Sequence, residues 1–325
     1  MKPSVSIIVA AWNAEAFLPR CLNSVIGQGF EDFELLLVDD GSSDGTGAIA
    51  DSYAAKDARI RVYHTENQGV AAARQLALDK ACGLYSIHLD ADDWAEPGSL
   101  AAMLEKAQAE RLDVLFTDFM VEQPGRSRIS RQDPRTRDSL LIQKMLLDRL
   151  HGSFLNKLIR TGIYRERGVR LPLGLSYAED QLTMLQLFSA PLRVGYLPLV
   201  FAHYDQSSNP ASLTRPGRRT LCLRQLDFWR RIPEAVEIRP LERDYYGLLC
   251  RYAFYALYRK ALEPGEYSSL YRPLKGRLAR CKSPLWRKAA VACSLSASYR
   301  LGFLLSRFSG KLHFTLARLF PKLSN

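Results

Sequence analysis

The densest group of chemistry-bearing side chains lies in "SIHLDADDWAEP", residues 86–97, where Asp90, Asp92 and Asp93 stand within four positions. Three like charges this close repel one another unless a cation offsets them. A lone Asp after a strand is ordinarily a turn or helix-capping residue, but a turn needs one Asp and not three. We therefore favour a ligand and metal site over a structural turn.

A second acidic pair, Asp39 and Asp40, ends another apolar run, "FELLLVD" at 33–39. In an open α/β sheet the carboxyl ends of the strands meet at one edge, and ligands bind there. We expect the two acidic groups to converge at that edge. Carboxylates in such a place suit a divalent cation that keeps positions free for phosphate oxygens.

Alternating strand and helix patterns must position these carboxylates. Continuous apolar runs predict strands, and apolar residues at helical spacing predict the helices between them. Strands are expected at 4–10, 33–39, 59–65, 85–90 and 113–122, and helices at 14–28, 44–56, 69–82 and 98–111. This alternation predicts an α/β domain with a mostly parallel central sheet and helices on both faces.

The pattern is less regular after residue 123. Residues 124–137 are polar, basic and interrupted by Pro and Gly, which favours a mobile loop. Residues 138–190 have helical periodicity with interruptions, and 192–204 returns to a strand pattern. From about residue 218 the pattern is helical, so we expect two domains, 1–214 and a basic helical region at 215–325.

Charge is distributed unevenly along the chain. The net charge is +11, yet residues 267–325 contain 12 Lys or Arg and no Asp or Glu. Aromatic and aliphatic residues are interleaved with these charges, a pattern typical of helices on anionic membrane surfaces. A solvated appendage, or packing against a second copy or another protein, is the alternative. Nucleic acid is disfavoured, because no recognition module is visible and the first part of the chain is acidic.

The remaining composition is that of a globular protein, 47% hydrophobic and 24% charged. The N-terminal segment lacks a signal-peptide pattern, and no uncharged apolar run approaches the roughly 18–20 residues of a membrane span. The six cysteines show no paired spacing, which favours reduced thiols over a disulfide framework or a zinc site. We therefore expect a cytoplasmic protein that is peripheral on the inner face of the plasma membrane.

Five segments together resemble the family-2 glycosyltransferases. They are "VSIIVAAWN", "LLLVDDGSSDGT", "ENQGVAAARQLAL", "IHLDADDW" and "YAEDQLT", in the order and at about the spacing of that family. The resemblance covers about residues 3–205 and implies the GT-A fold, a Rossmann-like α/β architecture. It also implies an inverting transfer of a sugar from a nucleotide-diphospho-sugar, with UDP as the expected nucleotide. The expected acceptor is a hydroxyl of a cell-surface glycan or of a lipid-linked molecule.

The resemblance implies donor-binding roles for several side chains. Asp40 would accept a hydrogen bond from the N3–H of a uracil-like base, because an ionised carboxylate can only accept. Arg74 would close over the same base or a nearby phosphate, and Trp12 could stack on the base. The remaining expected donor contacts are Asp39, Asn67, Asp90, Asp93 and His203.

Asp90-Ala91-Asp92 matches the DxD motif of the family. The resemblance implies that Asp92 coordinates Mn²⁺ or Mg²⁺ directly, with Asp90 beside it or toward the ribose. The ion would bridge the two phosphates and offset the charge that develops on the leaving diphosphate. Asp93 would fix the loop or approach the sugar hydroxyls.

"YAEDQLTMLQLF" supplies Glu179 and Asp180 at the start of an expected amphipathic helix, where the helix dipole favours negative charge. Such a pair is common in any protein, but the resemblance implies that Asp180 deprotonates the acceptor hydroxyl. Glu179 would orient it. Lys157, in "FLNKLIR", is expected either at a phosphate or acceptor, or on the surface. With His203, Ser212 and Thr214 would belong to a closing loop.

Two other functions stay open from the sequence. One is a catalytically inactive nucleotide-sugar-binding or scaffold protein, which the intact Asp40, Asp92 and Asp180 disfavour. The other is a sugar nucleotidyltransferase. That chemistry usually needs a Gly-rich, basic triphosphate loop near the first strand, and "AAWNAEAF" offers none.

Overall fold

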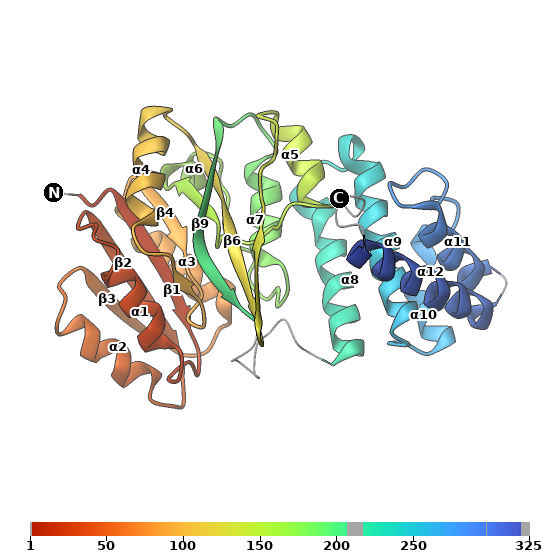
Figure 1. Ribbon diagram of the computed structural model, residues 1–325, viewed down its shortest axis with the longest axis horizontal. Coiled ribbons are helices and arrows are strands. Elements are labelled where there is room, and N and C mark those ends of the chain that lie inside the picture. The colour runs from red at the N-terminus through yellow and green to blue at the C-terminus, as the bar shows by residue number, and fades with distance from the viewer. Residues whose placement is uncertain (1, 207–216, 297, 320–325) are drawn as a thin grey trace. The chain divides into compact units, whose positions relative to one another are not determined.

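The computed structural model describes residues 2–206, 217–296 and 298–319, with side chains described to residue 309. The chain divides into two compact units, Met1–Ser212 and Leu213–Asn325. The boundary expected between residues 214 and 215 lies outside the described residues, as do Ser212 and Thr214. The described part of the first unit carries a large sheet, and that of the second is helical (Figure 1).

In the described part of the first unit, nine strands form one sheet in the order β3-β2-β1-β4-β8-β6-β9-β5, with β7 paired to β6. Their bounds are β1 Val5–Ala11, β2 Phe33–Asp40, β3 Ile60–Thr65, β4 Tyr85–His88, β5 Trp94–Ala95, β6 Val114–Gln123, β7 Arg126–Ser130, β8 Lys157–Arg160 and β9 Val194–Asp205. The neighbours β3, β2, β1 and β4 are parallel. Because β8 runs antiparallel to both β4 and β6, the sheet as a whole is mixed.

The helices of this unit cover both faces of the sheet (Figure 1). They are α1 Leu18–Ile26, α2 Thr46–Ala54, α3 Val70–Lys80, α4 Ser99–Ala109, α5 Ser139–Leu146, α6 Gly162–Glu166 and α7 Glu179–Leu187. Val5, Ile7 and Val9 of β1 share one apolar cluster with residues of α1 and α4. Their neighbours Ile8 and Leu36 are also buried, on the face where α3 packs against β1 and β2. The predicted α/β architecture with helices on both faces is therefore confirmed.

Two sequence predictions between residues 124 and 160 are wrong. Residues 126–130 are not a loop but the strand β7, which forms a hairpin with β6. Gly125, with a φ of 68°, makes the tight turn between them. Residues 157–160 are the strand β8 rather than part of a helical segment. Four residues are too few to show a period, so their pairing with β4 and β6 determines the strand.

The second unit has a core of its own. Its described elements are α8 Arg218–Ala235, a 3₁₀ turn Arg239–Leu241, α9 Glu242–Tyr258, α10 Pro264–Leu270, a 3₁₀ turn Arg272–Leu274, α11 Leu285–Ser296 and α12 Tyr299–Leu319. The central helix α9 packs against α8, α11 and α12. Trp229 of α8 stacks on Tyr245 of α9 with ring centroids 4.6 Å apart. None of the helices in the described ranges is long and apolar enough to cross a membrane.

Candidate active site

The loops that follow β1 and β2 are tied to one another by short polar side chains. The Asn13 N–H donates to Ser42 Oγ at 3.0 Å, and Asn13 Oδ1 accepts from the Ser43 N–H at 2.8 Å. The Ala14 N–H donates to Thr46 Oγ1 at 2.7 Å. These bonds fix the backbone directly after Trp12, which follows β1 and is 49% exposed.

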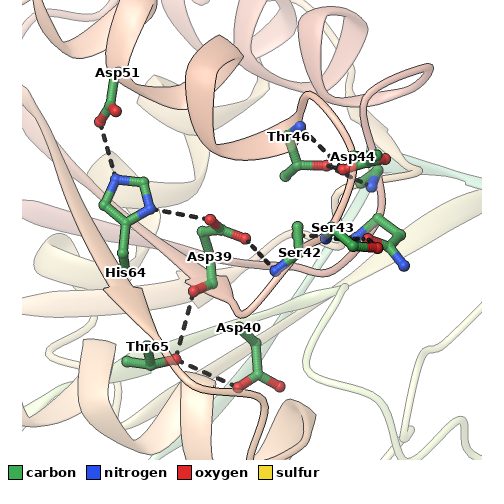
Figure 2. A network of polar contacts seen from close by, with 11 residues as sticks. Asp39, Asp40, Ser42, Ser43, Asp44, Thr46, Asp51, His64 and Thr65 are labelled. Carbon is green, nitrogen blue, oxygen red and sulfur yellow. Dashed lines mark hydrogen bonds and ion pairs between the residues drawn. The ribbon is translucent and has the colours of Figure 1, made fainter.

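Asp39 is buried and binds the same loop through its side chain. Its Oδ1 accepts from the Ser42 N–H at 3.1 Å, and its Oδ2 lies 3.0 Å from His64 Nδ1. Figure 2 shows the imidazole of His64 between the carboxylates of Asp39 and Asp51. The bonds to Asp39 and Asp51 raise the pKa of His64 above its usual range. Both Asp39 oxygens are thus bonded inside the protein.

Asp40 is buried at the end of β2 and faces the start of α3. Its Oδ1 accepts from the Gln68 N–H at 2.9 Å, and its Oδ2 accepts from the Gly69 N–H at 2.8 Å. Gly41, with a φ of 69°, approaches this loop so closely that a Cβ on it would lie 2.6 Å from the Asn67 backbone nitrogen. A carboxylate has about four acceptor sites, so Asp40 retains capacity for a further donor.

Arg74 of α3 joins two carboxylates that are far apart in the sequence. Its side chain is buried, and it donates to Asp90 Oδ1 and to Glu179 Oε1. Burial alone would lower the pKa of Arg74, but the charges of Asp90, Glu179 and Asp180 raise it above its ordinary value. The guanidinium therefore stays charged, and it brings the end of β4 and the start of α7 together.

The loop that carries Asp92 and Asp93 is anchored at its base. Asp93 is fully buried, and its Oδ1 accepts from the Asp205 N–H at 2.8 Å. Burial and the charges of Asp90 and Asp92 raise the pKa of Asp93 well above its usual range. Arg20 donates to the Asp92 carbonyl at 2.7 Å and to the Asp205 carboxylate at 2.8 Å. Asp93 thus holds the loop, while the side chains of Asp90 and Asp92 stay partly exposed.

His203 of β9 is engaged by two carboxylates. Its Nε2 lies 2.6 Å from Glu96 Oε2, and its Nδ1 lies 2.7 Å from Glu122 Oε1. Its ring stacks on Trp94 with centroids 4.8 Å apart. Since both ring nitrogens are bonded inside the protein, His203 holds the segment after the DxD motif against β9.

Helix α7 presents its acidic pair in its first turn, after Ala178 in the left-handed conformation at a φ of 59°. Glu179 points inward to Arg74. Burial, followed by the charge of Asp180, raises the pKa of Glu179 to about 7 against the opposing effect of Arg74. Asp180 is partly exposed, and its Oδ1 accepts from the Gln181 N–H at 2.7 Å. Asp180 is therefore the member of the pair that is open to a substrate.

Lys157 is completely buried, so the alternative of a surface lysine is wrong. It donates to the His151 carbonyl at 2.9 Å, the Asn156 side-chain oxygen at 2.8 Å and the Ser153 carbonyl at 2.5 Å. Burial lowers the pKa of Lys157 to about 7. All three of these acceptors belong to the protein, so the ammonium holds the backbone of residues 151–153.

His151 is a candidate site residue that sequence reasoning missed. Its side chain is exposed, and the charges of Asp180 and Asp90 both act on its ring. His151 does not have the sequence spacing of a metal ligand. It lies in a loop, so no helix or strand pattern predicts its position. Its position six residues before Lys157 is the one local signal that could have drawn attention to it.

The expected ligands of a metal ion are the carboxylates of Asp90 and Asp92. Among the described residues, no group of three or more His, Cys, Asp or Glu side chains could hold an ion by itself. Mg²⁺ in nucleotide sites, however, is usually bound by one or two carboxylates together with phosphate oxygens and water. Asp92 and Asp90 are oxygen donors with partly exposed side chains, so they fit an ion that binds together with a diphosphate.

Comparison with known proteins assigns this architecture to a class. Residues 6–168 match the family model described as glycosyl transferase family 2, over half of the chain. The matched segment contains both acidic groups at the strand ends and Arg74. The chain therefore belongs to glycosyl transferase family 2, as the resemblance in the sequence indicates.

Individual proteins support this assignment. EpsH of Bacillus subtilis (strain 168) is described as a glycosyltransferase. It is 30% identical to this chain over 209 residues, which cover 62% of this chain and 60% of EpsH. The chain thus matches about three fifths of the length of that relative. TarS 1–349 of S. aureus, solved with UDP-GlcNAc, superimposes with a TM-score of 0.74 at 18% identity, covering 96% of this chain and 92% of that one. The mannosyltransferase PcManGT of Pyrobaculum calidifontis was solved with GDP-Man and Mn²⁺. It superimposes with a TM-score of 0.57 at 16% identity, covering 99% of this chain and 88% of that one. These two likenesses confirm the GT-A-like fold.

Proposed function

We propose that this protein is an inverting glycosyltransferase. It moves a sugar from a nucleotide-diphospho-sugar, with UDP as the nucleotide, to a hydroxyl of a cell-surface glycan or a lipid-linked acceptor. The observation that carries the proposal is the double contact of Arg74. One buried guanidinium binds Asp90 of the DxD motif and Glu179, the neighbour of Asp180. A single displacement needs a donor site and a base on opposite sides of one sugar, and the contact of Arg74 with both segments supports this arrangement.

The donor site is proposed at the ends of β1 and β2. Asp40 keeps acceptor capacity for the N3–H of uracil, and the exposed face of Trp12 is available for stacking on the base. Asn67 is exposed in the loop that Asp40 holds. The TarS structure, which contains UDP-GlcNAc, supports UDP as the nucleotide.

Asp92 and Asp90 are proposed to hold Mn²⁺ or Mg²⁺ together with the donor diphosphate. When bound, such an ion supplies positive charge against the leaving diphosphate. The complex of PcManGT with GDP-Man and Mn²⁺ supports this assignment. Asp93 keeps the loop in place beneath the two ligands, and Arg74 fixes the orientation of Asp90.

Asp180 is proposed as the general base that takes the proton of the acceptor hydroxyl. Its partial exposure and its place in the first turn of α7 leave the carboxylate available. Glu179 orients this turn through its bond to Arg74.

A donor panel tests the proposal. UDP-sugars, added with Mn²⁺, are expected to raise the melting temperature, because a ligand at 100 times its Kd stabilises a protein by about 2.7 kcal/mol. Asp92→Asn should lose the Mn²⁺-dependent part of this shift. Glu105→Gln, an exposed carboxylate on α4, is the matched control and should behave as the unaltered protein. If neither UDP-sugars nor other nucleotide-sugars at millimolar concentration shift the melting temperature, the proposal is wrong.

The two regions are proposed to have different roles. Residues 1–214 carry out transfer, and residues 215–325 bind an anionic membrane surface. The support is a stripe of exposed apolar residues on α12 at positions i, i+3, i+4 and i+7, which is one face of a helix. They are Leu301, Leu304, Leu305 and Phe308, with Leu304 62% and Phe308 73% exposed. Arg300 and Arg307 flank the stripe, as in helices that lie in a membrane interface. The protein would then act on the inner face of the plasma membrane.

The double variant Leu304→Ser/Phe308→Ser is expected to lower binding to phosphatidylglycerol vesicles by about tenfold or more. Each of these side chains contributes roughly 1.5–3 kcal/mol when fully buried in an apolar phase. Vesicle co-sedimentation measures the effect, and Leu84→Ser, an exposed apolar residue of the first unit, is the control. Unchanged vesicle binding by the double variant contradicts the membrane proposal. A homo-oligomer that the double variant dissociates would show that a second copy covers the stripe instead.

A further inference from the structure

The loop of residues 150–153 lies directly against the first turn of α7. A Cβ on Gly152 would lie 2.4 Å from Cβ of Gln181, the residue that follows Asp180, so no larger residue fits between them. Gln181 is itself held by a bond from its Nε2 to the Leu146 carbonyl at 2.6 Å. The position of this loop is thus set by the same turn that presents Asp180.

Two further groups fix the backbone of the loop. The His151 N–H donates to Gln132 Oε1 at 2.7 Å. The ammonium of Lys157 binds the carbonyls of His151 and Ser153, and it lies 5.1 Å from the centroid of the Phe116 ring. A buried ammonium is stable only where its donors are satisfied, so the loop and Lys157 determine each other's position.

The same contacts favour one of the two neutral tautomers of the His151 ring. Nδ1 lies 2.7 Å from Ser153 Oγ and accepts from the Ser153 N–H at 3.4 Å. A backbone N–H can only donate, so Nδ1 is the acceptor and the neutral ring carries its proton on Nε2. Nε2 has no hydrogen-bond partner among the described residues.

We propose that His151 Nε2–H donates a hydrogen bond to an oxygen of the acceptor sugar, beside the hydroxyl that Asp180 deprotonates. This inference rests on the proposed function and adds an acceptor subsite to it. The loop packs on Gln181, the neighbour of Asp180. This packing favours the acceptor over the donor sugar. An uncharged N–H donor suits the uncharged oxygen of a sugar hydroxyl. Lys157 is the positioning residue that holds the loop.

Three substitutions at His151 separate this role from a structural one. The Gln side-chain nitrogen is as many bonds from Cβ as His Nε2, whereas that of Asn corresponds to Nδ1. With UDP-N-acetylglucosamine as donor and a panel of p-nitrophenyl glycosides as acceptors, His151→Gln should keep the acceptor KM within about threefold. His151→Asn and His151→Phe should raise it by about tenfold, the upper range for one uncharged hydrogen bond. The Kd for UDP, from calorimetry, is expected to stay within about twofold in all three variants.

Other results overturn the inference. If His151→Asn retains the acceptor KM and His151→Gln loses it, the ring only braces the loop through Nδ1. If the Kd for UDP rises with the acceptor KM, His151 belongs to the donor site. Nitrogen-15 NMR of histidine-labelled protein, with His151→Gln used to assign the signal, must show the Nε2–H tautomer at pH 7. A protein that binds no UDP contradicts the proposed function itself, whereas normal transfer by His151→Phe contradicts only the acceptor subsite.

Lys157→Met tests the positioning role. It keeps a long side chain but removes the three hydrogen bonds to the loop, so the acceptor KM should rise as in His151→Asn while the Kd for UDP is retained. Lys157→Arg keeps the positive charge but introduces a larger group, so it should also raise the acceptor KM. An unaltered acceptor KM in a folded Lys157→Met protein would show that the loop does not depend on this ammonium. Should Lys157→Met fail to fold, the exposed His151 variants still decide the main point.

Discussion

Replacing Asp180 by Asn is expected to lower the rate of sugar transfer by about 10²–10⁴-fold, the usual contribution of general-base catalysis. The amide cannot take up the proton of the acceptor hydroxyl. The fold should be unaffected, because the amide oxygen of Asn can still accept from the Gln181 N–H that Asp180 binds at 2.7 Å. The measurement is kcat with a UDP-sugar, together with the Kd for UDP by calorimetry.

The expected pattern is specific to a base. The Kd for UDP should stay within about twofold, because the proposed role of Asp180 is at the acceptor hydroxyl and not at the nucleotide. Glu105→Gln makes the same chemical change on an exposed part of α4, and its kcat should equal that of the unaltered protein. If Asp180→Asn keeps more than a tenth of the transfer rate, another group is the base. In the scaffold alternative, by contrast, the unaltered protein binds the donor and transfers nothing.

The second large effect is expected at Arg74. Arg74→Met should lower the free energy of unfolding by about 3–5 kcal/mol, because removal of one partner leaves a buried charge uncompensated. Most of the loss should come from Glu179, whose side chain is 9% exposed, since water screens the 40% exposed side chain of Asp90. Denaturant unfolding monitored by circular dichroism measures the change. Arg170→Met, which breaks an exposed pair with Asp79, is the control and should cost less than about 1 kcal/mol.

The loss at Arg74 should depend on pH. The pKa of Glu179 is raised to about 7, above the ordinary value of a glutamate, so the folded protein binds more protons than the unfolded chain between about pH 4.5 and 7. This group's contribution to stability therefore falls as the pH rises through that window. Removal of Arg74 takes away the charge that lowers this pKa. The destabilisation by Arg74→Met should thus be larger at pH 8 than at pH 5, and an equal loss at both would contradict an ionised Glu179 as its cause.

A double variant separates stability from function at the same place. Arg74→Met/Glu179→Leu replaces both buried partners by apolar groups and is expected to regain most of the lost stability, since such replacements are often neutral. It should not regain transfer, because Asp90 and the first turn of α7 are no longer joined. Restored transfer would show that the guanidinium is needed only for folding.

Much of the fold follows from local pattern in the sequence. Strands β1 and β2 consist mostly of apolar residues because helices cover both faces of the sheet, and the helices that follow them have their own period. Residues that end such strands meet at one edge, so the strand pattern alone is enough to place Asp39, Asp40 and the DxD group there. The short strands β7 and β8 could not be predicted, because their conformation depends on pairing with β6 and β4.

By itself, the sequence determined the family, the α/β architecture and the acidic character of the site, because strand and helix periods and the motif residues are local properties of the chain. Only the tertiary structure decided which partner each side chain meets. Arg74 lies 16 residues from Asp90 and 105 from Glu179, and only the order of strands in the sheet brings the three together. The same is true of His203, which lies between two glutamates, of the burial of Lys157, and of the packing of Gly152 against Gln181. Burial and ion pairing depend on which distant elements pack together, and no local pattern records that.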